Sequence, residues 1–291
     1  RYDDTYRVIN INLSVCEGEI YGFLGPNGAG KSTTLKMILG LTKPTDGRVT
    51  VFGKDLETNR HFILSKTGSL IESPSYYGHL TGLENMCVVQ RLRDFPDKNV
   101  EEALKIVRLD KQKDKKVEHY SLGMKQRLGI AMALLSFPKL LILDEPTNGL
   151  DPAGIGEIRE LIKSLPKRYD MTVLISSHLL SEIEQIATSV GIINDGMMVF
   201  QGSMEDLKRK SNPTIMIKTR NNKLAQELLF QKGYSPTQHG DFLVFENLTD
   251  EQVARANRSL IAGNIDVLRI EEHKKNLENI FLDITGKERS L

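Results

Sequence analysis

The amino-acid sequence predicts an α/β fold followed by a smaller α+β domain. Three observations support this. Short apolar runs alternate with helical patterns, a glycine-rich loop follows the first of these runs, and the character of the chain changes after Ser203. Alternating buried strands and helices are typical of a parallel sheet covered by helices.

The apolar runs supply the strands of the predicted sheet. They lie at residues 20–24, 49–52, 140–143 and 173–175, and each has the length of a buried strand. A helix is expected from near Gly30 through residue 39, because Gly40 is a typical residue at a helix end.

A second group of helices is predicted between these strands. Residues 83–117 are charged and mostly helical in pattern, and Ser121 is a suitable cap for a helix that runs toward Leu135. We therefore expect an inserted helical subdomain at about 83–138.

The segment Lys208 to Pro213 is charged, lacks an apolar pattern and ends in proline, which predicts a domain boundary. We expect a first domain at 1–210 and an accessory domain at 211–291. Strand candidates in the second domain are 215–218, 242–245 and 267–270. One helix face, made by Leu277, Ile280, Phe281 and Ile284, is expected to pack on this small sheet.

Bulk properties exclude several classes of protein. The 39 Lys and Arg residues nearly cancel the 38 Asp and Glu residues, which argues against a broad basic surface for nucleic acid. Cys16 and Cys87 are far apart in sequence, so we interpret both as small buried residues of a reducing compartment. No apolar run approaches the roughly 18 to 20 residues of a membrane span.

The glycine-rich loop matches the pattern G-x-x-x-x-G-K-[ST] after a strand, which predicts a phosphate-binding loop. Its residues are Gly25, Pro26, Asn27, Gly28, Ala29, Gly30, Lys31, Ser32 and Thr33. The glycines let successive N–H groups point at phosphate oxygens, and the following helix adds its positive end. Lys31 offers a charge to the β- and γ-phosphates, Ser32 a hydroxyl to Mg²⁺, and Thr33 a donor to the α-phosphate. The pattern indicates a nucleoside triphosphate as ligand.

Two adjacent carboxylates, Asp144 and Glu145, end the strand at 140–143. Neighbouring side chains of a strand point to opposite sides, so Asp144 can hold the Mg²⁺ shell while Glu145 turns toward the γ-phosphate and polarises a water. The alternative is that both acids only solvate a strand end.

Further segments, taken in order, give the chain a resemblance to the ATPase domain of ABC transporters. Residues 120–127 read YSLGMKQR, which resembles the family signature LSGGQ with Ser121 and Gly123 kept. Residues 148–151 read NGLD and are similar to the loop that reaches across the family's dimer, and His178 follows the strand at 173–175.

The resemblance implies a P-loop NTPase fold, ATP and Mg²⁺ as ligands, and two subunits that sandwich two nucleotides. It implies that Ser121 and Gly123 grip the γ-phosphate held by the opposite subunit, that His178 contacts the γ-phosphate, and that Tyr2 stacks on adenine, with Tyr6 as a second candidate. Leu122 and Met124 depart from the signature.

Where most of the family has glutamine, this sequence has Glu72. The segments around it, ESPSYY at 72–77 and LTGLEN at 80–85, resemble ATPase subunits of bacterial transporters for bacitracin and lantibiotic-type peptides. A further negative charge beside triphosphate would repel it, so we expect Glu72 to act through Mg²⁺. The alternative is a solvated loop acid.

The resemblance implies an ATP-hydrolysing subunit, bound to a separate permease at the cytoplasmic face of the cell membrane, that exports a peptide antibiotic. Alternatives are an ABC ATPase for another exported substrate, a soluble ABC ATPase that acts without a permease, and a module that binds ATP without hydrolysing it. The single phosphate loop argues against the soluble class, and Glu145 with His178 argues against the last.

Overall fold

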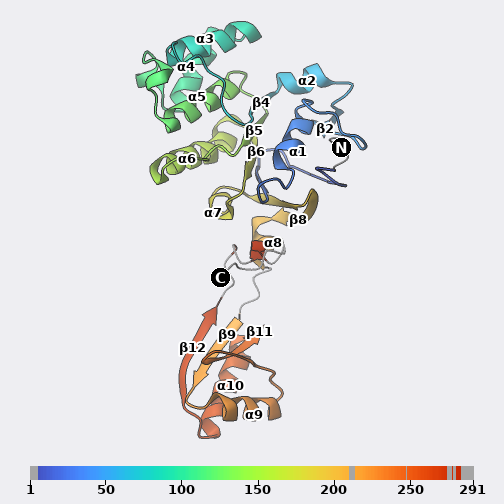
Figure 1. Cartoon of the computed structure of the whole chain (residues 1–291), viewed down its shortest axis with the longest axis vertical. Helices are drawn as coiled ribbons and strands as arrows, with labels where there is room; N and C mark the ends of the chain where they lie inside the picture. Colours follow the sequence, from blue (N-terminus) through green and yellow to red (C-terminus); the bar gives the residue numbers. More distant parts are fainter. Residues whose placement is uncertain (1–5, 210–213, 247, 274–276, 278–279, 283–291) are drawn as a thin grey trace. The chain divides into compact units, whose positions relative to one another are not determined.

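The computed structural model describes residues 6–209, 214–246, 248–273, 277 and 280–282. The chain divides into two compact units, residues 1–204 and 205–291 (Figure 1). The boundary expected from the sequence, after residue 210, lies slightly further along the chain. Each unit is described by itself below.

Unit 1 is built on a six-stranded sheet in the order β4-β5-β6-β1-β7-β8. Its strands are β1 (Ile20–Leu24), β4 (Thr67–Leu70), β5 (Leu140–Asp144), β6 (Thr172–Ser177), β7 (Ser189–Asn194) and β8 (Met197–Ser203). All neighbouring pairs are parallel except β7 and β8, which are antiparallel. A separate two-stranded sheet joins β2 (Thr50–Val51) and β3 (Lys54–Asp55).

The helices of unit 1 fall into two groups. Around the sheet lie α1 (Lys31–Ile38), α2 (Arg60–Ser65), α6 (Pro152–Tyr169) and α7 (Leu180–Ile183). The helix α8 (Met204–Arg209) begins at the last residue of unit 1 and belongs mostly to unit 2. The helices α3 (Gly82–Arg93), α4 (Asp97–Ile106) and α5 (Leu122–Leu134) form a group of their own in Figure 1, with short 3₁₀ turns at Asp110–Gln112 and Val117–His119.

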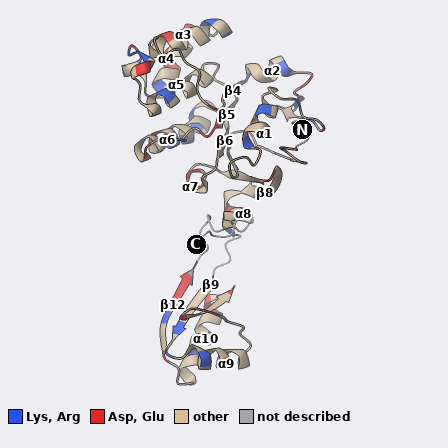
Figure 2. Ribbon diagram, viewed as in Figure 1, with Lys and Arg blue, Asp and Glu red and all other residues tan. Residues whose placement is uncertain are grey.

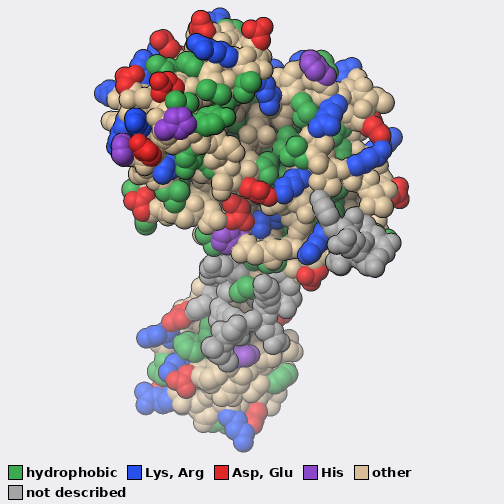
Figure 3. Space-filling view, turned by 45° about the horizontal axis from the view of Figure 1, so that its top comes forward, with side chains coloured by type: hydrophobic (Ala, Val, Ile, Leu, Met, Phe, Trp, Pro, Cys, Tyr) green, Lys and Arg blue, Asp and Glu red, His purple; other side chains and the backbone are tan. Residues whose placement is uncertain are grey.

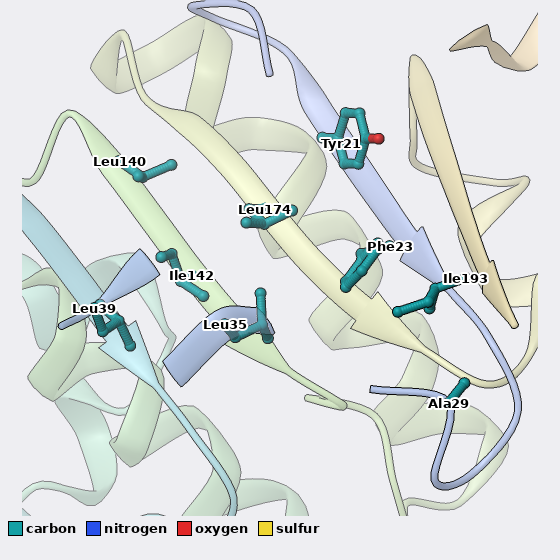
Figure 4. Close-up of a cluster of buried hydrophobic side chains, with 9 residues drawn as sticks. All are labelled: Tyr21, Phe23, Ala29, Leu35, Leu39, Leu140, Ile142, Leu174 and Ile193. Atoms are coloured by element: carbon teal, nitrogen blue, oxygen red, sulfur yellow. The ribbon is translucent and has the colours of Figure 1, made fainter. Parts of the chain in front are cut away.

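One part of the core seats α1 on the sheet. Phe23, Ile142 and Leu174 come from three neighbouring strands and form a buried cluster with Leu35 of α1 (Figure 4). These side chains are almost completely excluded from water, with exposed fractions of 0 to 1%. Burial of apolar area lowers the free energy of the folded chain by about 25 cal/mol per Å². The contacts of this cluster therefore hold α1 against the sheet.

The strand order determines where the site can form. The register pairs Leu24 with Ser177 and Asp144 with Ser176, so β1, β5 and β6 end side by side. Ligands of open α/β sheets bind outside the carboxyl ends of the strands. The segments that follow these strands hold Lys31, Glu145 and His178.

Unit 2 contains a four-stranded antiparallel sheet in the order β10-β11-β9-β12. Its elements are β9 (Thr214–Thr219), α9 (Asn222–Gln231), β10 (Thr237–His239), β11 (Phe242–Glu246), α10 (Asp250–Ala262) and β12 (Val267–His273). This βαββαβ succession is a split βαβ arrangement of the ferredoxin-like kind. Ile217, Leu229, Leu243 and Leu260 are fully buried in its core.

The strands expected at 20–24, 140–143, 173–175, 215–218, 242–245 and 267–270 are confirmed, with ends that differ by at most three residues. The expectation that 49–52 is a strand of the parallel sheet is wrong, because Thr50–Val51 pairs with β3 in the separate antiparallel sheet. Leu277 and Ile280 are helical and buried, whereas Ile284 lies outside the described residues. The expectation that both cysteines are buried is wrong: Cys16 is exposed in the irregular segment directly before the turn at residues 17–18, and Cys87 is half-buried.

Charged side chains of both signs are distributed over helices α3 to α6 (Figure 2). On the face of unit 1 that Figure 3 shows, Lys and Arg are likewise interspersed with Asp and Glu. In the described part of the chain, no helix is long and apolar enough to cross a membrane.

Candidate functional site

The loop at 25–30 connects β1 directly to α1. Gly28 and Gly30 have positive φ angles of 82° and 108°, which favour glycine. A Cβ at Gly30 would lie 2.7 Å from the carbonyl oxygen of Arg7, so the loop has no room for a larger residue there. Gly30 is the N-cap of α1 and offers no side-chain cap, which leaves the first N–H groups of the helix available to an anion.

Lys31 is buried, with 5% of its surface exposed. Its ammonium group donates to the carbonyl oxygens of Gly25 at 2.7 Å and Pro26 at 3.3 Å, and lies 3.3 Å from Oε1 of Glu145. A lysine has three N–H donors, and these three acceptors match them. A phosphate oxygen that binds Lys31 must therefore displace at least one of them.

Glu145 is the centre of the site. Its Oε1 faces Lys31, and its Oε2 lies 2.6 Å from Nδ1 of His178. The residue has a φ of 46°, a left-handed conformation that is uncommon outside glycine. This kink directly after β5 turns the carboxylate toward the segments that follow β1 and β6.

Asp144 is buried at the end of β5, where its Oδ1 accepts a hydrogen bond from Ser176 at 2.5 Å. Ser176 Oγ in turn accepts from the backbone N–H of Glu145 at 3.0 Å, so both neighbouring acids are held by one serine of β6. No local pattern indicated Ser176, because it lies 32 residues from Asp144 along the chain.

The predicted metal ligands are of the right chemical type. Ser32 and Asp144 offer a hydroxyl and a carboxylate oxygen, the donors that Mg²⁺ prefers. Within the described ranges, no group of three or more His, Cys, Asp or Glu side chains could enclose a metal.

Glu72 follows β4 and is more exposed than the other candidate ligands, with 66% of its side chain in contact with solvent. Its Oε1 lies 2.6 Å from Nζ of Lys36, one turn beyond Ser32 on α1. The ion pair keeps this carboxylate at the α1 side of the site. Lys36 was not among the residues indicated by the sequence.

Ser121 caps α5, because its Oγ accepts from the backbone N–H of Met124 at 3.2 Å. The segment at 148–151 lies against this helix start: a Cβ on Gly149 would be 3.2 Å from Leu122, and a Cβ on Gly123 would be 3.9 Å from Leu150. Leu122 is 53% exposed.

The two aromatic candidates have different outcomes. Tyr2 lies outside the described residues. Tyr6 is 57% exposed and lines a groove of about 970 Å³ together with residues 7–13, 15–17 and 42–53, to which Thr33 also contributes. Lys31, Glu145 and His178 do not line this groove.

Known proteins resemble the chain over most of its length. A family model described as ABC transporter matches residues 8–148. The bacitracin transport ATP-binding protein BcrA of Bacillus licheniformis is 42% identical over 290 residues, which cover 98% of this chain and 94% of that protein. The lantibiotic transport ATP-binding protein SrtF of Streptococcus pyogenes is 43% identical over 215 residues, which cover 72% and 92% of the two chains.

Solved structures of ABC transporter subunits also resemble the chain. The structure of the ATP binding subunit of an ABC transporter is 30% identical with a TM-score of 0.64 and covers 72% of this chain and 88% of that chain. The dimeric structure of MJ0796, a bacterial ABC transporter cassette, is 28% identical with a TM-score of 0.62 and covers 68% and 91% of the two chains.

Proposed function

Because this chain belongs to the ABC transporter family of ATP-binding proteins, we propose that it hydrolyses ATP at the carboxyl ends of β1, β5 and β6 to drive a separate membrane permease. The observation that carries this proposal is the placement of the Glu145 carboxylate between Lys31 and His178. The cluster combines a cation that can bind phosphate (Lys31), a base (Glu145) and an imidazole (His178) beside a phosphate-binding loop.

In this proposal, each residue has a distinct task. The amides of Gly28, Ala29 and Gly30 and the side chains of Asn27 and Thr33 contribute to ATP binding, and Lys31 neutralises charge on the β- and γ-phosphates. Glu145 orients the attacking water and accepts its proton, and His178 holds the γ-phosphate in line. The hydrogen bond between Oε2 of Glu145 and Nδ1 of His178 fixes the direction of the Glu145 carboxylate before ATP binds.

Ser32, Asp144 and Glu72 are the residues we propose to hold Mg²⁺. The ion would supply charge neutralisation across the β- and γ-phosphates. The burial of Asp144 and its bond from Ser176 support a fixed position for its carboxylate. The Glu72 side chain is exposed and paired with Lys36. This supports a role in which Glu72 binds Mg²⁺ only after its ion pair with Lys36 breaks.

We further propose that two copies of the chain enclose two ATP molecules. ATP-binding subunits of this family dimerise and work with membrane permeases. In our assembly, the Ser121 and Gly123 end of α5 from one copy completes the phosphate site of the other. The capped start of α5 supports this, because its first N–H groups form a second anion site.

The proposed cargo is a peptide antibiotic of the bacitracin or lantibiotic class, exported from the cell. This rests on the names of the relatives and on Glu72 with the segment that follows it. The proposed location is the cytoplasmic face of the cell membrane, on the permease. Another exported substrate is the alternative.

The test is to produce the chain with its permease in a bacterium sensitive to bacitracin and to a lantibiotic. The expected result is a higher inhibitory concentration of one of these peptides, and ATPase activity of membrane vesicles that this peptide stimulates. The matched control is the same strain with E145Q, which we expect to remain sensitive. ATPase activity without protection against either peptide would support the enzyme and contradict the cargo.

A further inference from the structure

We infer that Glu182 is a positioning residue that holds the loop of Glu145 and the loop of His178 together. Glu182 lies on the short helix α7, four residues beyond His178. The inference rests on the proposed ATPase function and assigns a task to a residue outside the recognised motifs.

One carboxylate oxygen of Glu182 accepts hydrogen bonds from the loop of Glu145 and from the end of β6, directly before His178. Thr147 Oγ1 donates to Oε2 at 2.5 Å, and Ser177 Oγ donates to the same atom at 3.3 Å. Thr147 and Ser177 are 8% and 3% exposed. Buried hydroxyl groups without a partner are costly, so these bonds constrain both loops.

The positions of the two donors give this contact its significance. Thr147 lies two residues after Glu145, and Ser177 directly precedes His178. The strands β5 and β6 pair only as far as Asp144 and Ser176, and the N–H of Glu145 adds one more bond to the carbonyl of Ser176. Beyond this point, the bonds that join the two loops in the described structure are made by side chains.

Two side-chain connections join the loops there. The first is the 2.6 Å pair of Glu145 Oε2 and His178 Nδ1, which contains the reacting groups themselves. The second is the Glu182 contact with Thr147 and Ser177. When ATP and water engage Glu145 and His178, the first connection changes, and the second remains to hold the loops in place.

The expected effect is on the chemical step rather than on ATP binding. The hydrogen bonds of Glu182 go to Thr147 after β5 and to Ser177 at the end of β6, whereas most of the proposed contacts with ATP lie in the loop at 25–33. Misplacing a reacting group by about 1 Å can lower the rate roughly hundredfold. Removing Glu182 should therefore lower kcat and leave the affinity for ATP unchanged.

The chemistry of the contact provides a matched control. Both donors are neutral hydroxyl groups, so the contact needs an acceptor oxygen at this position rather than a negative charge. E182Q retains a carbonyl oxygen, whereas E182A retains none. At the other end, T147S keeps the hydroxyl and T147V removes it with little change in volume.

The experiment measures kcat and KM for ATP on the chain assembled with its permease, and the affinity of the isolated chain for a fluorescent ATP analogue. For E182A and T147V we expect kcat to fall roughly tenfold to hundredfold, with analogue affinity within about twofold of wild type. E182Q and T147S should stay within about fivefold of the wild-type kcat. E160A removes an exposed carboxylate of α6, paired with Lys163, and serves as the control for a lost surface charge.

The double variant E182A/T147V separates a shared contact from two independent effects. If the hydrogen bond is the cause, the double variant has about the same kcat as E182A alone, because E182A already removes the bond that T147V removes. A wild-type kcat for E182A, a low kcat for E182Q with ATP affinity retained, or additive losses would each overturn the inference. If E182A also loses ATP affinity, the result for T147V tests the inference: a lower kcat with ATP affinity retained supports it, and a wild-type kcat overturns it. If the wild-type assembly hydrolyses no ATP, the proposed function fails instead.

Discussion

The backbone at Glu145 shows how a single residue can be placed for chemistry at a cost in stability. A left-handed conformation costs a residue other than glycine roughly 1 to 2 kcal/mol. Here it is held by the hydrogen bonds from the Glu145 N–H to Ser176, by the ion pair with Lys31 and by the contact with His178. The result is a carboxylate that faces the phosphate-binding loop instead of solvent.

The contact of Lys31 with Glu145 leads to a prediction for E145Q. This change removes the negative charge that competes with phosphate for Lys31, so ATP affinity should be equal or higher. Loss of the base should lower hydrolysis by at least about hundredfold. Equilibrium binding of ATP and the rate of phosphate release measure the two effects. E57Q, which removes an exposed acid paired with Lys43, is the control, and rapid hydrolysis by E145Q would contradict the assigned role.

The ion pair between Glu72 and Lys36 is largely exposed, and such pairs contribute only about 0 to 1 kcal/mol. Glu72 can therefore leave Lys36 at little cost and approach a cation at Ser32. We predict that E72Q raises the Mg²⁺ concentration for half-maximal ATPase activity about tenfold, the equivalent of one lost charge-assisted contact.

A Mg²⁺ titration of ATPase activity tests the role of Glu72, with K36A as the matched variant. K36A breaks the same ion pair but keeps the carboxylate, so its Mg²⁺ requirement should be unchanged or lower. An E72Q protein with the Mg²⁺ requirement of wild type would show that Glu72 is a solvated loop acid.

At the scale of the element, α3 illustrates how helix starts are fixed locally. Thr81 Oγ1 accepts from the N–H of Glu84 at 3.1 Å, and Glu84 Oε2 accepts from the N–H of Thr81 at 2.7 Å. This reciprocal pair is a capping box. The hydrogen bond from the backbone of Thr81, followed by that from its side chain, lowers the pKa of Glu84.

We predict that T81A destabilises the chain by about 1 kcal/mol, because it removes a helix cap. Urea unfolding followed by circular dichroism measures the change, and T81S, which keeps the hydroxyl, should match wild type. The lowered pKa means that the Glu84 contribution is complete above the pKa of the unfolded chain and is lost as pH falls through that of the folded chain. The difference between wild type and E84Q should therefore shrink in acid. A difference that grows in acid would contradict this capping role.

At the scale of the whole molecule, the proposed dimer places Ser121 opposite the phosphate loop of a second copy. We predict that E145Q becomes dimeric on addition of ATP, because the nucleotide is retained. In the same background, S121R should still bind ATP but remain monomeric, since an added bulky cation would occupy the contact between copies. Analytical ultracentrifugation with ATP measures this.

The arginine control for that experiment is S65R, at the exposed end of α2, which should dimerise like E145Q alone. A dimer of the S121R protein would show that the start of α5 lies outside the interface. For unit 2, we propose that residues from 211 onward form an accessory domain. Its separate four-stranded sheet with a ferredoxin-like strand order supports this.

Local patterns in the sequence were sufficient to predict the phosphate loop, the acids that end β5, the cap of α5 and the central strands β1, β5 and β6. Each depends on neighbours within a few residues. The strands β4, β7 and β8 were not among the predicted apolar runs. The strands β3 and β10 were missed because they contain only 2 and 3 residues and carry no apolar run or alternation. Glu72, Ser121 and His178 were suggested by resemblance, because their motifs are specific only in combination.

Only the tertiary structure showed which of these residues meet. Lys31, Glu145 and His178 are distant in sequence, and they come together because β1 and β5 both pair with β6. The same packing created the contacts of Lys36 with Glu72 and of Glu182 with Thr147 and Ser177. The sequence determined by itself that the chain handles a nucleoside triphosphate, since that needs one local loop. The arrangement of base, cation and imidazole was decided by the strand order, which depends on long-range packing.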